Sequence, residues 1–104
     1  MNHIGYISGV ITDGFALCED LRFYLKNSLS KGKLSLRVAQ SSNKVYIESP
    51  VFKSIDAHYV CLVWDSNQKK INFVWRNDEG EIKTFDTLIK LAEDIENSII
   101  NKED

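Results

Sequence analysis

The chain has 104 residues, with 13 lysines and arginines against 15 aspartates and glutamates, which gives a formal net charge of -2. This length predicts a single domain over residues 1–104, and 43% hydrophobic with 27% charged residues indicates a globular chain. The charge argues against a nucleic-acid-binding protein, no apolar run is long enough to span a membrane, and the N-terminus lacks a secretory signal pattern. We therefore expect a cytoplasmic protein.

The N-terminal third predicts a strand and then a helix. Residues 3–11 alternate in the manner of a strand, with glycines that suggest a bulge or the close approach of another element. Residues 15–31 have apolar side chains at helical spacing, and either Thr12 or Asp13 can cap this helix. Gly32 is the predicted stop.

The middle of the chain predicts strands in hairpin order. Alternating patterns cover residues 33–39 and 44–49, while residues 51–57 are ambiguous and fit one turn of helix. Three further strands follow, at residues 58–64, 71–75 and 81–85.

The three later strands differ in polarity. The first is apolar on both faces, which is typical of a central strand, and the third is polar enough for an edge, guarded by Glu81 and Lys83. Trp64 and Trp75 share their faces with aliphatic residues, so both are predicted to lie in the core.

A helix is predicted over residues 86–100, capped by Asp86. Its apolar stripe is Leu88, Leu91, Ala92, Ile95 and Ile99, and its outer side chains are Lys90, Glu93, Asp94 and Glu96. The element order predicts an α+β fold. In it, a curved antiparallel sheet of five to six strands has the N-terminal-half helix and the C-terminal helix packed on it.

The chain contains no pattern that indicates catalysis. Asp56 and His58 lie two residues apart, but no nucleophile or acid accompanies them, so we expect no enzyme activity and no catalytic residue. On a strand, His58 and Cys61 would point to opposite faces, so we expect no metal site.

No cofactor is expected either. Gly5, Gly9 and Gly14 precede a helix, but phosphate-binding loops place their glycines closer together and follow them with lysine and serine or threonine. Cys18 and Cys61 are expected to be reduced core thiols.

Charge is distributed unevenly along the sequence. Six basic and two acidic residues lie between Phe15 and Lys44, whereas six acidic and two basic residues lie between Asp86 and Asp104. Two solvated faces would account for this division, and so would a protein-binding surface whose acidic part attracts a basic partner. Tyr46 shares a face with lysine and glutamate, so it is the aromatic side chain that we expect to be exposed.

In size and plan the chain resembles the small immunity proteins of bacterial toxin systems, including those of contact-dependent growth inhibition. The resemblance implies a non-catalytic protein that binds a cognate toxin domain, often a basic nuclease, and blocks its active site. We expect the partner-binding residues to be Asp78, Glu79, Glu81, Glu93, Asp94, Glu96 and Tyr46.

Two other binding functions remain open. One is nucleic-acid binding through the basic region from Arg22 to Lys44 together with Tyr46, against which the net charge argues. The other is a secretion chaperone that binds an unfolded segment along a sheet edge or a helix face.

Overall fold

The computed structural model describes residues 13–40, 43–52, 58–77 and 79–103, so the strand predicted over residues 3–11 lies outside them. The helices are α2 (Gly14–Tyr24), α3 (Lys26–Ser30) and α4 (Leu88–Glu103). The strands are β1 (Ser35–Val38), β2 (Lys44–Glu48), β3 (Tyr59–Asp65), β4 (Lys70–Arg76) and β5 (Ile82–Phe85).

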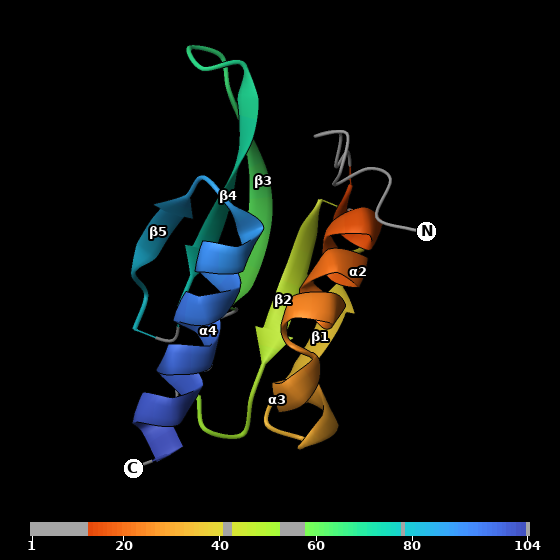
Figure 1. Cartoon of the computed structure of the whole chain (residues 1–104), viewed down its shortest axis with the longest axis vertical. Helices are drawn as coiled ribbons and strands as arrows, with labels where there is room; N and C mark the ends of the chain where they lie inside the picture. The colour runs from red at the N-terminus through yellow and green to blue at the C-terminus, as the bar shows by residue number, and fades with distance from the viewer. Residues whose placement is uncertain (1–12, 41–42, 53–57, 78, 104) are drawn as a thin grey trace.

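The five strands form one antiparallel sheet in the order β1-β2-β3-β4-β5, so each strand pairs with its neighbour in the sequence. The predicted fold class is therefore confirmed, with β3 central and β5 at an edge. Figure 1 shows α2 in front of β1 and β2, and α4 in front of β4. No described helix lies on the other side of the sheet, which we call the open face.

The first helix begins where the sequence predicts it. The Asp13 carboxylate accepts a hydrogen bond from the backbone N–H of Ala16 at 3.0 Å, which caps α2. The predicted single helix is divided at Leu25, whose φ of -107° and ψ of 14° depart from helical values. Gly32 ends α3 with a φ of +69°, a conformation that costs glycine little.

The core lies between the two long helices and the covered face of the sheet. Leu17 and Leu21 of α2, Val60 of β3 and Trp75 of β4 are fully buried there. The apolar stripe predicted for the last helix is also buried throughout: Leu88, Leu91, Ala92, Ile95 and Ile99.

Trp64 was predicted to lie in the core, and this prediction is wrong, because its relative exposure is 61%. Trp64 pairs with Ile71, beyond the stretch of β3 that pairs with β2 and beyond the stretch of β4 that pairs with β5. At this point the sheet is a two-stranded ribbon that extends past the helices (Figure 1). The apolar pattern continues to the end of the strand, but the covering elements do not.

The start of α4 also differs in detail from the prediction. The hydroxyl of Thr87 accepts a hydrogen bond from the Lys90 N–H at 3.4 Å, so Thr87 provides the cap contact that was predicted for Asp86. The Asp86 carboxylate instead pairs with the Lys90 ammonium at 3.4 Å.

Candidate functional site

The turn between β4 and β5, which we call the acidic turn (residues 77–81), is held by one buried side chain. Asn77 is 5% exposed, and its Oδ1 accepts hydrogen bonds from the N–H groups of Glu79 and Glu81, both at 3.0 Å. Its Nδ2 donates to Glu81 Oε1 at 3.0 Å, and its backbone N–H donates to the Glu81 carbonyl at 3.0 Å. The described part of the turn is therefore preorganised, and it presents two exposed glutamates.

A polar hollow of about 180 Å³ separates the acidic turn from the C-terminal half of α4. The ammonium of Lys102 reaches back from α4 to Glu79 Oε2 at 3.1 Å and ties the helix to the turn. The lining residues are Asn77, Glu79, Glu81, Lys83, Asp94, Asn97, Ser98, Asn101 and Lys102.

The acidic residues predicted on α4 do not behave alike. Asp94 is half-buried and accepts a hydrogen bond from the indole Nε1 of Trp75 at 3.0 Å, while the Lys83 ammonium lies 3.3 Å away. Glu96 accepts a hydrogen bond at 3.2 Å from Ser28 of α3, so it joins two helices. Glu93 alone of the three acids is exposed. Asp94 and Glu96 therefore have structural contacts that their helical spacing did not reveal.

The exposed acids of this region are Glu79, Glu81 and Glu93. Lys83 pairs with Asp94 and Lys102 pairs with Glu79, so this surface is less negative than the count of acidic residues in the sequence suggests. Asp78 was also predicted to bind the partner, and it lies outside the described residues. Lys83 and Glu81 were expected to guard the sheet edge, but their side chains contact Asp94 and Asn77 instead.

Tyr46 lies two strands away from Arg76, the residue that precedes the acidic turn. It lies on the open face of the sheet, where it is half-buried, whereas α4 packs against the covered face. The strand register places it in a row of four residues directly opposite one another on adjacent strands: Arg37, Tyr46, Tyr59 and Arg76. We call these residues the Arg–Tyr row. Alternation along each strand indicated the face, but only the register aligns the four residues.

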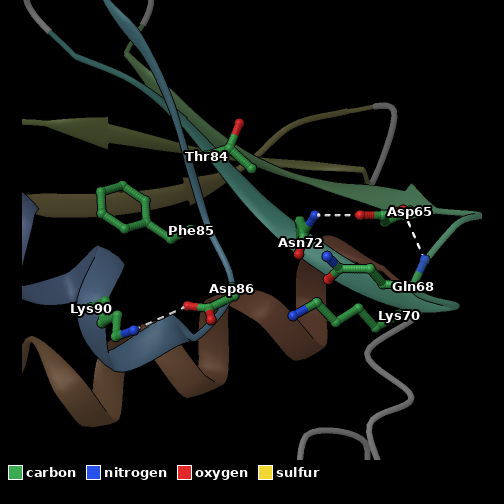
Figure 2. A pocket seen from close by; sticks show the side chains of 8 residues that line it. All are labelled: Asp65, Gln68, Lys70, Asn72, Thr84, Phe85, Asp86 and Lys90. Atoms are coloured by element: carbon green, nitrogen blue, oxygen red, sulfur yellow. Dashed lines mark hydrogen bonds and ion pairs between the residues drawn. The ribbon is translucent and has the colours of Figure 1, made fainter.

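A second hollow, of about 440 Å³, opens where β5 is too short to cover the beginning of β4 (Figure 2). The Asn72 amide donates to Asp65 Oδ2 at 3.4 Å, and Asp86 pairs with Lys90 across the opposite wall. The hydrogen bond from the Lys90 ammonium, together with its positive charge, lowers the pKa of the Asp86 carboxyl. Because two acidic and two basic side chains line the hollow, it has no charge preference.

The residues considered for catalysis and metal binding lie apart. His58 is buried, with its ring 5.0 Å from that of Phe52, and Asp56 lies outside the described residues. Within the described ranges, no group of three histidine, cysteine or acidic side chains is placed to hold a metal ion.

Both cysteines are free thiols. Cys18 is in the core as predicted, but Cys61 is only half-buried and lies on the open face. Burial raises the pKa of each thiol, and the nearby charge of Lys44 opposes this rise at Cys61.

No family model, curated protein or solved structure matches the chain. Among the described helices, none combines the length and apolar character needed to cross a bilayer.

Proposed function

We propose that the protein is a non-catalytic, cytoplasmic binding protein that neutralises a cognate, basic toxin domain in the manner of an immunity protein. The observation that supports this proposal is the set of hydrogen bonds that Asn77 makes to the described residues of the acidic turn. Asn77 holds the backbone of Glu79 and Glu81 in place. The Glu81 carboxylate also accepts a hydrogen bond from the Asn77 amide, and that of Glu79 pairs with Lys102, so both side chains have less conformational freedom to lose on binding. Side chains that are already ordered bind a partner at a smaller entropic cost.

The polar hollow beside the turn adds a place for a basic side chain. Glu79, Glu81 and Asp94 line it, and an arginine from a partner could displace the Lys102 ammonium from Glu79. Replacement of the Lys102–Glu79 pair costs little free energy, because ion pairs at a surface contribute little to stability. A guanidinium binds carboxylates in bidentate fashion, which suits the basic groove of a nuclease.

The test begins with a candidate partner. We expect a neighbouring gene to encode a toxin domain, and the purified toxin domain should form a one-to-one complex with this protein. In isothermal titration, the double variant Glu79→Gln/Glu81→Gln should bind at least tenfold more weakly, and stopped-flow association should slow and lose salt dependence.

The matched control is Glu19→Gln, which removes an exposed acid from α2, away from the turn. It should leave affinity within about twofold of the parent, as expected for a charge at a distance. Equal affinities of the parent and the double variant would refute the role of the acidic turn. Failure of every neighbouring toxin domain to bind would refute the immunity function itself.

A further inference from the structure

We propose that the open face of the sheet binds single-stranded nucleic acid, at a site distinct from the hollow between the acidic turn and α4. The site is the Arg–Tyr row together with Lys44. Opposed residues on neighbouring antiparallel strands lie about 5 Å apart, so the row crosses four strands as a continuous strip. The proposal does not depend on the function proposed above.

The two tyrosines form the centre of the strip. Their ring centroids are 6.4 Å apart and their planes meet at 83°, an edge-to-face contact that holds both rings in position. Nucleobases stack on aromatic side chains of this kind when strands are unpaired, and every base offers a flat face for the contact. Tyr46 and Tyr59 therefore provide an ordered aromatic platform in a region that no described helix covers.

Positive charge surrounds the platform. The Arg37 guanidinium lies over the Tyr46 ring, 4.5 Å from its centroid, and the Lys44 ammonium lies over the Tyr59 ring, 4.4 Å from its centroid, so a stacking base would take the place of these cations on the rings. Arg76 continues the row beyond Tyr59, and its guanidinium reaches toward Gly80 of the acidic turn. These cations are positioned to meet phosphates on either side of stacked bases.

The open face has an excess of basic residues although the whole chain is acidic. The register places Arg37, Lys44, Lys70 and Arg76 on this face, against Glu48 and Asp65. Glu48 pairs with Arg37 at 3.3 Å, but both side chains are more than half exposed, so a phosphate can compete for the guanidinium. Charge complementarity together with the aromatic pair favours a nucleic acid over an acidic protein.

The experiment uses the 104-residue chain and fluorescence anisotropy. The probes are a labelled single-stranded DNA of about 12 nucleotides, within the site sizes of small single-strand-binding folds, and an RNA of the same sequence. We expect binding at about 50 mM salt, with a log–log salt slope of about -2 for three phosphate contacts. Comparison of the DNA and RNA affinities shows which polymer is preferred. A duplex of the same sequence should bind more weakly than the single strand, because its bases are not free to stack on the tyrosines.

Two kinds of variant test the platform. Tyr46→Ala and Tyr59→Ala should each weaken binding roughly tenfold or more, because each removes one stacking surface. Lys44→Gln should reduce the salt slope by about 0.7 without loss of fold, which keeps the test decisive if a tyrosine variant unfolds. Circular dichroism and thermal unfolding establish which variants are folded.

The matched controls are Phe23→Ala and Lys26→Gln. Lys26 also lies over an aromatic ring, 5.3 Å from the centroid of Phe23, but on the helical side of the molecule. Both controls should bind the probes as the parent does.

The absence of binding to either probe at low salt would overturn the proposal. Equal losses in the control variants would also overturn it, as would binding of a poly-glutamate peptide as tight as that of the oligonucleotide. This last result would identify the face as a surface for acidic proteins.

Discussion

Removal of the Asp94 carboxylate should destabilise the fold, although the sequence pattern places this residue on the outer side of its helix. Trp75 is fully buried, and its indole N–H donates to Asp94 Oδ2 at 3.0 Å. In Asp94→Ala this donor loses its acceptor, which costs about 1–3 kcal/mol. The half-exposed pair with Lys83 adds at most about 1 kcal/mol, and the higher helix propensity of alanine returns about 0.5 kcal/mol.

These terms sum to a net loss of about 0.5–3.5 kcal/mol. The middle value of about 2 kcal/mol corresponds to a fall in Tm of about 8–16 °C for a domain of this size. The assay is urea unfolding followed by tryptophan fluorescence in a Trp64→Phe background. The exposed Trp64 is thereby removed, and the signal reports Trp75 alone.

Two companion variants make the test specific. Asp94→Asn keeps an oxygen acceptor for the indole, so it should lose only about 1 kcal/mol. Glu93→Ala alters the adjacent, exposed acid and should stay within about 0.5 kcal/mol of the parent. If Asp94→Ala and Glu93→Ala cost the same, the structural role assigned to Asp94 is refuted.

Three further predictions follow from local geometry. Gly32→Ala should lower the free energy of unfolding by about 1 kcal/mol, because alanine is strained at a φ of +69°. Steric contact is not the cause, since no atom lies within 4 Å of the added carbon. An unchanged midpoint of urea unfolding would contradict this prediction. Lys44→Gln should raise the pKa of the Cys61 thiol further, because the lysine charge opposes the rise caused by burial. The pH profile of iodoacetamide alkylation at Cys61 should therefore shift upward in the variant, while the profile at Cys18 should be the same in the variant and the parent. Lys90→Gln should bring the lowered pKa of Asp86 back toward its ordinary value in an NMR titration. At pH values above the pKa that Asp86 has in the unfolded chain, the Asp86–Lys90 contact stabilises the folded state. This stabilisation is lost as the pH falls through the lower pKa that Asp86 has in the folded state.

The candidate site was only partly predictable from the sequence. Glu79, Glu81 and Glu93 are exposed as expected, because a polar turn and the outer face of an amphipathic helix are local features. Asp94 and Glu96 are not, because their contacts with Trp75 and Ser28 join residues far apart in the chain. A helical period shows which side of a helix is polar, but it does not show which neighbour lies against the edge of that side.

Net charge also depends on composition alone and carries no information about where the charges lie on the surface. A formal charge of -2 argues against nucleic acid only if the charges are mixed over the surface. The strands place Arg37, Lys44, Lys70 and Arg76 on the open face against two acids, Glu48 and Asp65, whereas the exposed acid Glu93 lies on α4. The basic interval from Arg22 to Lys44 is itself divided, with Arg22 on α2 and Lys44 on the open face.

The sequence by itself determined the described strands, the capped first helix and the last helix, because each depends on a repeat of two or about 3.6 residues and on nearby turn or cap residues. Only the tertiary structure decided how far the helices cover the sheet, and so left Trp64 exposed while Trp75 is buried. It also decided the register that aligns Tyr46 with Tyr59. Coverage and register depend on contacts between distant segments, and no local period specifies them.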